Sequence, residues 1–458
     1  MDFSLFDRLV DEQAPRWIQE LVEFCRIPSE TGHPEELRLA ANWTTKRLKR
    51  LGAKTEVVLI EGIPPLVLAE IGSGTRVVIC VQHYDVQPAA PLDLWTTPPF
   101  EPTIRDGHLF ARGSGDNKGS FLARLYAVEA YRDAFGELPC RVRFLVEGEE
   151  ESGSRHLTKL LSKRPEFLEA DAALNEAGYI DNGDRPLVTC GLRGMLYVEL
   201  AVRTLARDIH SEMAMLLPNA AERMMKALAT LKTADGRVAI KGFYDEVRGP
   251  SAEQLAHLRT VPFEEQALKR LHGAAEFVGG RTGYQAQAAS MFEPTCNVSG
   301  VWSGWNGPDM KTVIPAEAHA KLDLRLVPDQ EPHRIAELLR QHLDALGFTD
   351  VELTTTLASE SPWWTPISHP LAEIAAKASE DMFGVPAARL ISSMSTAPMY
   401  QICAPYRLPA VGFGLAHPDN RAHAPDENIR LDLMVKAIKV FGRFLERFAD
   451  LPSWNHRR

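Results

Sequence analysis

The sequence lacks the features that would mark a membrane protein or a nucleic-acid-binding protein. No apolar run approaches the roughly 20 residues that a membrane-spanning helix needs. The first residues do not show the basic and then apolar pattern of a signal peptide. Positive charge is in the minority, because 61 Asp and Glu residues outnumber 51 Lys and Arg residues and give a net charge of −10. Phosphate neutralisation needs clustered basic residues, so we expect no nucleic-acid partner and no membrane partner.

Cysteine is scarce, and its spacing argues against a thiolate metal site. The 458 residues include six cysteines, several of them inside apolar runs and none in a CxxC pair. We therefore expect reduced core cysteines in a cytoplasmic protein. The absence of a GxSxG elbow argues against a serine hydrolase. The glycine-rich loop at 113–119 lacks the GK[ST] ending of a phosphate-binding loop.

The most informative stretch that is present is an acidic run, Glu147-Gly-Glu149-Glu150-Glu151, directly after the apolar run 142–146. Four carboxylates in five positions repel one another, and burying them beside a core strand is costly unless a cation or a proton compensates. An acidic turn in solvent is the simpler interpretation of such a run taken alone. The alternative is a metal site with a spare carboxylate that acts as a base.

The same pattern recurs at two other places in the chain. The apolar run 76–81 is followed by His83 and Asp85, and the run 170–174 is followed by Glu176. Between them, Asp116 lies in a glycine-flanked turn, where the backbone can approach an ion closely. Because ligands bind beyond the carboxyl ends of strands in open α/β sheets, this recurrence favours a metal site.

The order of the predicted elements indicates the fold class, which is α/β. Helix and strand patterns alternate in the first third of the chain and resume from about residue 366, which predicts a mostly parallel central sheet flanked by helices. The residues between follow the pattern of an inserted α+β domain. We place a discontinuous catalytic domain at 1–192 and 358–458, and the inserted domain at 193–357. The stretch 235–290 fits neither domain clearly and is expected to form helices of its own.

The periodicity of the apolar residues divides the chain into helical and extended segments. Helices are predicted at 35–51, 120–135, 220–231, 332–346, 371–383 and 431–448. Strands are predicted at 55–59, 66–71, 76–81, 141–146, 170–174, 195–202, 295–302, 318–326, 351–357 and 410–413.

A series of short motifs runs along nearly the whole chain. In order, they are His83-Tyr-Asp85-Val-Gln-Pro88, Trp95 with Pro98-Pro-Phe-Glu-Pro102, Gly113-Ser-Gly-Asp116-Asn-Lys-Gly119, Glu147-Gly-Glu-Glu150-Glu151-Ser-Gly-Ser154, Gly191-Leu-Arg-Gly194, Asp208-Ile-His210-Ser211, Arg325-Leu-Val-Pro328 and His423-Ala-Pro-Asp-Glu427-Asn428. Together they resemble the co-catalytic zinc peptidases of clan MH, which include carnosinase, carboxypeptidase G, aminoacylase and succinyl-diaminopimelate desuccinylase. The details at Trp95 and after Glu150 are closest to the dipeptidase branch.

The resemblance implies a centre of two zinc ions per subunit, which manganese or cobalt could replace. By this resemblance Asp116 bridges the two ions. One zinc would also be held by His83 and Glu176, and the other by Glu151 and His423. Asp181 and Asp184 are nearby alternatives to Glu176, although they are typical of turn residues.

The resemblance also implies the catalytic roles. Glu150 would be the general base, and Asp85 would orient a metal-binding group from behind it. The register of the three glutamates could be shifted by one position, but the Ser-Gly-Ser that follows favours Glu150 as base and Glu151 as ligand. A cis peptide bond after Asp116 is also implied.

The inserted domain is expected to serve as a lid and dimerisation domain and to supply groups that contact the substrate. His210 resembles a histidine that polarises the scissile carbonyl, often across a homodimer interface. Arg325 resembles an arginine that pairs with a substrate carboxylate, and Asn297 is a further candidate. The sequence departs from the family after His210 and in the loop 392–398, where Ser395 and its neighbours replace a glycine-rich segment.

These features predict a metal-dependent amide hydrolase, most simply a di-zinc dipeptidase or aminopeptidase acting on short peptides through a bridging water activated by Glu150. An N-acyl-amino-acid deacylase, of the deacetylase or desuccinylase type, is the alternative, because both substrates end in a carboxylate. A catalytically silent binding protein is disfavoured by the complete set of candidate ligands.

Overall fold

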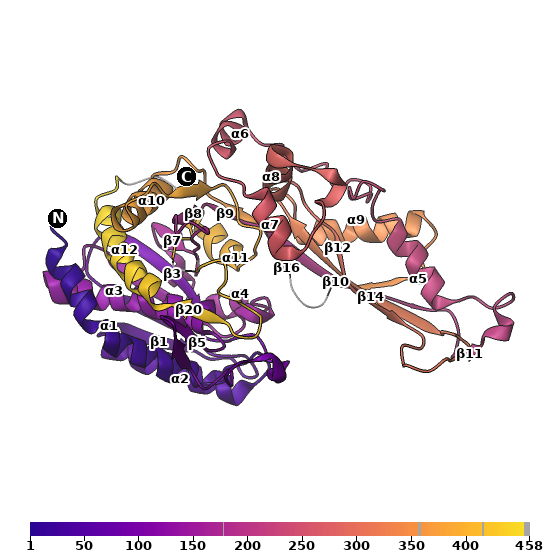
Figure 1. Ribbon diagram of the computed structural model, residues 1–458, viewed down its shortest axis with the longest axis horizontal. Helices are drawn as coiled ribbons and strands as arrows, with labels where there is room; N and C mark the ends of the chain where they lie inside the picture. The colour runs from indigo at the N-terminus through magenta and orange to yellow at the C-terminus, as the bar shows by residue number, and fades with distance from the viewer. Residues whose placement is uncertain (177, 356–358, 415, 453–458) are drawn as a thin grey trace. The chain divides into compact units, whose positions relative to one another are not determined.

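The computed structural model describes residues 1–176, 178–355, 359–414 and 416–452, and it divides into two compact units (Figure 1). The first unit comprises Met1–Gly191, Trp364–Ser393 and Ala397–Arg458, and the second comprises Leu192–Trp363 and Met394–Thr396. The predicted domain boundary between 357 and 358 lies outside the described residues. The segment Met394–Thr396 belongs with the second unit because the Ser395 carbonyl accepts a hydrogen bond from the Arg193 amide.

The first unit is built on a six-stranded sheet in the order β1-β2-β6-β3-β7-β19. Its four strands β6, β3, β7 and β19 run parallel, whereas β1 and β2 are antiparallel at one edge. The strands are β1 (Lys54–Val58), β2 (Leu66–Ile71), β3 (Val77–His83), β6 (Arg141–Glu147), β7 (Ala172–Leu174) and β19 (Ala410–Val411). All seven residues of β3 are buried, as is typical of a parallel strand covered on both faces. This sheet confirms the predicted α/β class.

Helices cover this sheet. α3 contacts α1 and α12, and α12 contacts α10. These helices are α1 (Ser4–Cys25), α3 (Gly119–Phe135), α10 (Pro370–Phe383) and α12 (Leu431–Ala449); α2 (Pro34–Arg50) packs on β1 and β2. α10 begins with Pro370 and ends at Gly384, whose φ of 69° is left-handed, so its two ends carry the residues that commonly start and stop helices. No helix among the described residues is long and apolar enough to cross a membrane.

Short elements complete the first unit around the sheet edges. They are β4 (Thr103–Arg105), β5 (His108–Phe110), α4 (Leu157–Leu161), β8 (Leu187–Thr189), β18 (Ala388–Leu390), α11 (Met399–Cys403) and β20 (Asn428–Arg430). β20 pairs with β5, which brings the C-terminal part of the chain beside residues 108–110.

The second unit holds an antiparallel sheet in the order β12-β14-β10-β15, with helices α5 and α9 packed on it. Buried and partly exposed residues alternate along β10 and β14, which places Leu196, Val198, Leu322 and Leu324 in the core. The main elements are β10 (Gly194–Arg203), α5 (Ala220–Ala229), β12 (Asn297–Ser303), β14 (Glu317–Leu326), α9 (Pro332–Ala345) and β15 (Glu352–Thr354). The stretch 235–290 contains α6 (Ala252–Leu258), α7 (Glu265–His272) and most of α8 (Gly283–Phe292).

A buried ion-pair network joins α1, α2 and α3. Arg47 Nε donates to Glu20 Oε2 at 2.7 Å, and Arg47 Nη2 also bonds Glu129. The Arg47 side chain is only 2% exposed. We expect the Arg47→Ala variant to lower the free energy of unfolding by about 1.5–3 kcal/mol. Both carboxylates lose their charge-assisted hydrogen bonds to a buried cation and keep only the partly exposed Arg16 and Arg50 as cationic partners.

Urea unfolding measures this loss, and Arg38→Ala on the same helix is the matched control. Arg38 pairs with Glu35 at 3.2 Å, but both side chains are exposed, so its loss should cost less than about 1 kcal/mol. Equal stability of the two variants would contradict the role assigned to Arg47.

Candidate metal centre

Three neighbouring parallel strands deliver acidic and histidine side chains to one edge of the first unit's sheet. His83 ends β3 and is paired in register with Glu147, which ends β6. Glu150 and Glu151 follow β6, and Glu176 follows β7 after one intervening residue. The carboxyl ends of parallel strands meet at the same edge of a sheet, so residues far apart in the sequence come together here.

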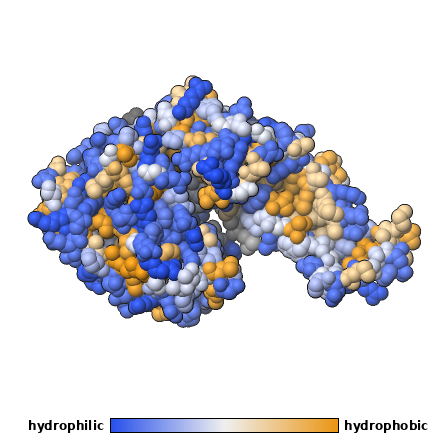
Figure 2. All heavy atoms as spheres, viewed as in Figure 1, coloured by the Kyte–Doolittle hydropathy of each residue, from blue (hydrophilic) through white to orange (hydrophobic). Residues whose placement is uncertain are grey.

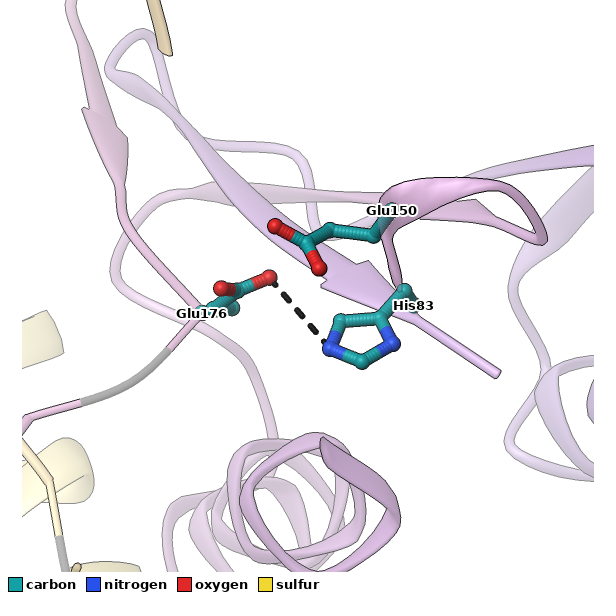
Figure 3. Close-up of side chains that lie close together, drawn as sticks. All are labelled: His83, Glu150 and Glu176. Atoms are coloured by element: carbon teal, nitrogen blue, oxygen red, sulfur yellow. Dashed lines mark ion pairs between the residues drawn. The ribbon is translucent and has the colours of Figure 1, made fainter. Parts of the chain in front are cut away.

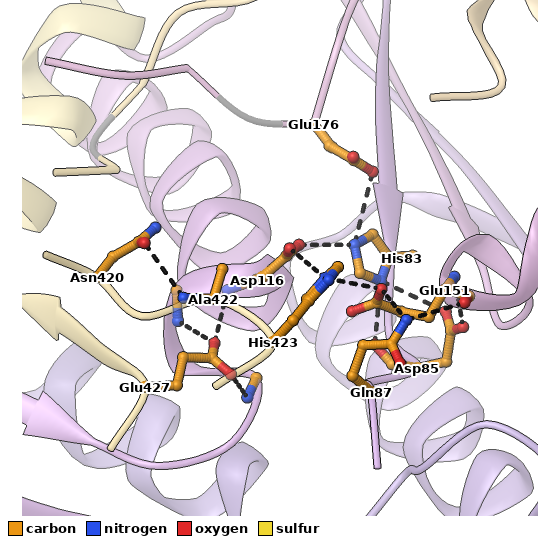
Figure 4. Close-up of polar contacts among 12 residues, drawn as sticks. His83, Asp85, Gln87, Asp116, Glu151, Glu176, Asn420, Ala422, His423 and Glu427 are labelled. Carbon is orange, nitrogen blue, oxygen red and sulfur yellow. Dashed lines mark hydrogen bonds and ion pairs between the residues drawn. The ribbon is translucent and has the colours of Figure 1, made fainter. Parts of the chain in front are cut away.

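Asp116 lies at the middle of the group (Figure 4). Its Oδ1 is 3.1 Å from His83 Nε2, and its Oδ2 is 3.3 Å from His423 Nε2. The turn that holds it requires a glycine at Gly113, where φ is 81° and an added Cβ would clash with Val86. The Asp116–Asn117 peptide bond is cis, as the resemblance implies. One carboxylate therefore faces two histidines, one on each of its oxygens.

The remaining predicted ligands divide between the two sides of Asp116. Glu176 Oε2 is 3.6 Å from His83 Nε2, and Glu151 Oε2 is 3.0 Å from His423 Nε2. The structure thus brings the five predicted ligands together in two groups that share Asp116. The His83 side chain is fully buried whereas that of His423 is 53% exposed, so the cluster opens on the His423 side.

The neighbouring glutamates have different surroundings. Single ligand atoms of Glu150, His83 and Glu176 lie within 4.8 Å of one another, and Figure 3 shows these three side chains together. Glu149 instead accepts a hydrogen bond from His156 Nδ1 at 3.0 Å. The register with Glu150 inside the cluster and Glu149 outside it is therefore the one that the structure adopts.

The alternatives to Glu176 have other partners. Asp181 Oδ1 accepts hydrogen bonds from the Gly183 and Arg185 amides at 2.8 and 2.9 Å, which is a turn contact. Asp184 pairs with Arg430 at 2.7 Å. Neither belongs to the described group of candidate ligands.

Crowding of charge perturbs the titration of the cluster. Burial and the neighbouring Glu176 carboxylate raise the pKa of Glu150 well above its usual value. Burial also raises the pKa of Glu176 to about 7, against the charge of His83. Hydrogen bonds to Asp116 and Glu151 raise the pKa of His423 to about 10. Protons thus balance the negative charge of the group, and divalent cations bound to it would displace them.

The residues fit a metal ion in donor chemistry. Imidazole nitrogens and carboxylate oxygens are common ligands of zinc, and manganese and cobalt accept the same donors. Glu176 Oε2 is buried and accepts no hydrogen bond within the described part of the chain. An unsatisfied buried acceptor costs about 1–3 kcal/mol, which coordination to a cation would remove.

Asp85 supports the cluster from behind. It is fully buried, its backbone carbonyl is 3.0 Å from His83 Nδ1, and its Oδ2 accepts a hydrogen bond from the Glu151 amide at 3.1 Å. The carbonyl can only accept, so His83 Nδ1 carries the proton and donates. His83 Nε2 is left to face Asp116 and Glu176, which is the arrangement that a metal-binding histidine needs.

Two further residues contact the cluster without having been assigned a role from the sequence. Gln87 Nε2 donates to both the carbonyl oxygen and Oε2 of Glu151, each at 3.1 Å. Glu427 Oε1 accepts a hydrogen bond from the Asp116 backbone amide at 3.0 Å. Both belong to the motifs that begin at His83 and His423, so their sequence signal is membership of those motifs.

The predicted substrate-contacting residues all lie in the second unit. Arg325 Nη1 donates to Thr396 Oγ1 at 2.7 Å, which places Arg325 beside the segment that contains the exposed Ser395. Asn297 Nδ2 donates to Asp323 at 2.8 Å. His210 is exposed on β11 (Ile209–His210), where its Nδ1 accepts the Glu212 amide at 3.1 Å. Their roles toward a substrate stay predictions.

Known proteins are similar to this sequence over most of its length. Beta-Ala-His dipeptidase of Rattus norvegicus is 27% identical over 475 residues, which cover 97% of this chain and 95% of that protein. The Cys-Gly metallodipeptidase of Schizosaccharomyces pombe is 26% identical over 475 residues, which cover 98% of this chain and 99% of that protein.

Solved structures are similar over nearly the full chain as well. An M20 family metallo-carboxypeptidase from Sulfolobus solfataricus superimposes with a TM-score of 0.90 at 34% identity, covering 95% of this chain and 99% of that one. Human carnosine dipeptidase 1 superimposes with a TM-score of 0.84 at 27% identity, covering 97% of this chain and 98% of that one. These relatives confirm the predicted resemblance and the fold class.

Most of the chain also matches the model of one protein family. Residues 80–447 match Peptidase family M20/M25/M40. This span includes every predicted metal ligand and much more than half of the chain. The chain therefore belongs to Peptidase family M20/M25/M40 and is a metallopeptidase.

Proposed function

We propose that this metallopeptidase is a dipeptidase that binds two zinc ions and hydrolyses short peptides. The observation that carries the proposal is the Asp116 carboxylate, whose two oxygens face His83 and His423 at 3.1 and 3.3 Å. A single carboxylate between two ligand groups is the arrangement that a pair of metal ions needs. The names of relatives such as Beta-Ala-His dipeptidase and the Cys-Gly metallodipeptidase support a dipeptide substrate.

In this proposal each ion is held by three side chains, with Asp116 in common. His83 and Glu176 would complete one set, and Glu151 and His423 would complete the other. When bound, two zinc ions supply Lewis-acid polarisation of the scissile carbonyl and acidify the attacking water. Manganese or cobalt would supply the same chemistry with this donor set.

Glu150 is the proposed proton carrier. Its carboxylate lies beside His83 and Glu176, and its surroundings raise its pKa well above the usual value. A base whose pKa lies nearer the working pH both accepts and releases a proton efficiently. Glu150 would take a proton from the attacking water and deliver it to the leaving amine, so that the amide C–N bond breaks to give a free amine and a carboxylate.

Groups of the second unit are the proposed substrate contacts. Arg325 would pair with the substrate carboxylate, because a guanidinium fork matches that group. Its hydrogen bond to Thr396 Oγ1 at 2.7 Å uses Nη1 and leaves its other nitrogens as donors. Asn297 and Ser395 would contact the substrate backbone, and His210 would stabilise the oxyanion.

The reaction class can be tested with a matched set of substrates. The set comprises a free dipeptide, its N-acetyl form, its C-terminal amide and a tetrapeptide, each tested with zinc-loaded, manganese-loaded and chelator-treated protein. We expect chelator-sensitive cleavage of the free dipeptide only, because a dipeptidase recognises both a free amine and a nearby carboxylate.

Each of the other outcomes would indicate a different function or a different way of recognising the substrate. Release of acetate from the N-acetyl form would establish the deacylase alternative. Stepwise release of single residues from the C-terminus of the tetrapeptide would indicate a carboxypeptidase, the activity named for the 34% identical Sulfolobus solfataricus structure. Release from the N-terminus would indicate an aminopeptidase. Cleavage of the amide as fast as the free dipeptide would contradict the proposed role of Arg325.

A second prediction isolates the proton carrier. We expect Glu150→Ala to lower kcat by roughly 100- to 10,000-fold, the range for loss of a general acid–base group, while metal content stays unchanged. Glu149→Gln is the matched control, because Glu149 is adjacent but bonds His156 at 3.0 Å outside the cluster. Steady-state kinetics and metal analysis of both variants measure these effects. An inactive Glu149→Gln variant would reverse the assignment.

We also propose a homodimer formed through the second unit of a cytoplasmic protein. β12 is an edge strand whose Val298, Val301 and Trp302 are 42, 58 and 43% exposed. Figure 2 shows apolar residues gathered on the visible surface of this unit. An exposed apolar edge strand favours association with another chain. All six cysteines are buried, and none forms a disulfide in the described part of the chain, which supports a reducing location.

Light scattering measures this assembly directly. We expect a mass of twice the 50.9 kDa of one chain, and a charge placed on the edge, as in Val301→Lys, should shift the protein toward the monomer because a desolvated charge is costly. Leu59→Lys is the matched control. Leu59 lies in the first unit and is 70% exposed, so this variant should leave the mass unchanged. A wild-type monomer would contradict the proposal.

A further inference from the structure

Glu427 is a buried carboxylate whose two oxygens are both saturated by the loop that carries Asp116. The residue is 1% exposed. Oε1 accepts the backbone amides of Gly115 and Asp116, each at 3.0 Å. Oε2 accepts the Gly113 amide at 2.9 Å and Arg112 Nη1 at 2.8 Å. Four hydrogen bonds to one carboxylate define the path of the loop from residue 112 to residue 116.

The same residue is attached to the segment that carries His423. Glu427 lies four positions after His423. Asn428 closes this segment into a loop, because its amide donates to the Asn420 carbonyl at 2.8 Å. The Asn428 side chain also donates to the Asp419 carbonyl at 3.0 Å. Figure 4 shows Glu427 beside the Asp116 segment, with Asn420 and Ala422 of the His423 loop next to it.

The two ligand groups therefore have different supports. His83 is the last residue of β3 and is paired with Glu147 of β6, and Glu176 lies two residues after β7, which is paired with β3. Asp116 and His423 lie on loops without such pairing. Glu151 has its own anchors, the carboxylate of Asp85 and the amide of Gln87. The β5–β20 ladder joins residues 108–110 to residues 428–430. The Glu427 side chain extends this connection to the Asp116 turn itself.

We propose that Glu427 is a positioning residue that holds Asp116 and His423 at the separation required by the metal ion that they share with Glu151. This inference rests on the proposed two-metal function. Its consequence is selective: losing Glu427 weakens the ion held by loops and spares the ion held with His83 and Glu176. Residues behind the ligands of metal sites typically change metal affinity by about 10- to 100-fold.

The test is Glu427→Gln in the full chain. The amide keeps the side-chain shape but replaces one oxygen with an NH₂ group, which would meet N–H donors from the loop or Arg112. Chelator-treated protein is titrated with zinc against a chromogenic competitor. We expect the first equivalent to bind as in wild type and the second to bind roughly 10- to 100-fold more weakly, with kcat recovering as zinc is raised.

Asp171→Asn is the matched control. Asp171 is also a carboxylate that accepts from a backbone amide and an arginine, Val77 N at 2.8 Å and Arg76 Nη1 at 3.0 Å. It directly precedes β7 and binds Val77, the first residue of β3, whereas His83 is the last residue of that strand. Its loss should leave both zinc affinities unchanged, which separates positioning from a general loss of stability.

The outcomes decide between the explanations. Unchanged binding of both equivalents in Glu427→Gln, or equal weakening of both, would overturn the proposal. If this variant does not fold, Glu427→Asp, which keeps the charge but shortens the reach by one methylene, is judged by the same criterion. A wild type that binds one equivalent contradicts the two-metal function instead; Glu427 then keeps its positioning role only if the variant binds that equivalent at least about tenfold more weakly.

Discussion

The crowding of negative charge at the carboxyl ends of three parallel strands is the constraint on which the rest of the structure depends. Glu150, Glu151 and Glu176 meet around Asp116 in surroundings that raise the pKa of all three glutamates. An uncompensated buried charge costs several kcal/mol, so the cluster is stable only with protons or cations on it. The fold maintains this costly arrangement through the sheet, which fixes the strand ends, and through polar groups that restrain each ligand from behind.

Two buried carboxylates provide most of the polar contacts that hold these ligands from behind. Asp85 fixes the tautomer of His83 and the amide of Glu151 at once. Glu427 fixes the turn before Asp116. Both carboxylates are buried. Four N–H donors compensate the charge of Glu427, whereas Asp85 accepts the Glu151 amide through Oδ2. Carboxylates thus have two roles within the first unit, as candidate metal ligands and as supports behind those ligands. The hydrogen-bond donors around each carboxylate distinguish the two roles.

The sequence predicts the sheet, and it predicts which residues meet around Asp116, because both signals are local. A parallel strand buried on both faces needs a continuous apolar run, and runs such as 76–81 end directly at a ligand. The helix Ser4–Cys25 was not predicted, although Phe6, Val10, Trp17 and Leu21 are buried at helical spacing. The role of Glu427 could not be predicted, because its contacts join residues more than 300 positions apart through loop conformations. The place of Met394–Thr396 in the second unit depends on such contacts too.

Selectivity among substrates must come from outside the metal cluster, because a dipeptidase and a deacylase need the same ligands and the same base. The loop 392–398, where the sequence departs from the glycine-rich pattern that the resemblance implies, is the place to look. Its Thr396 Oγ1 accepts a hydrogen bond from Arg325 Nη1 at 2.7 Å. A residue without a hydroxyl at that position would leave this donor without its partner. The loop therefore acts on the orientation of the residue proposed to bind the substrate carboxylate, and it contributes none of the candidate metal ligands.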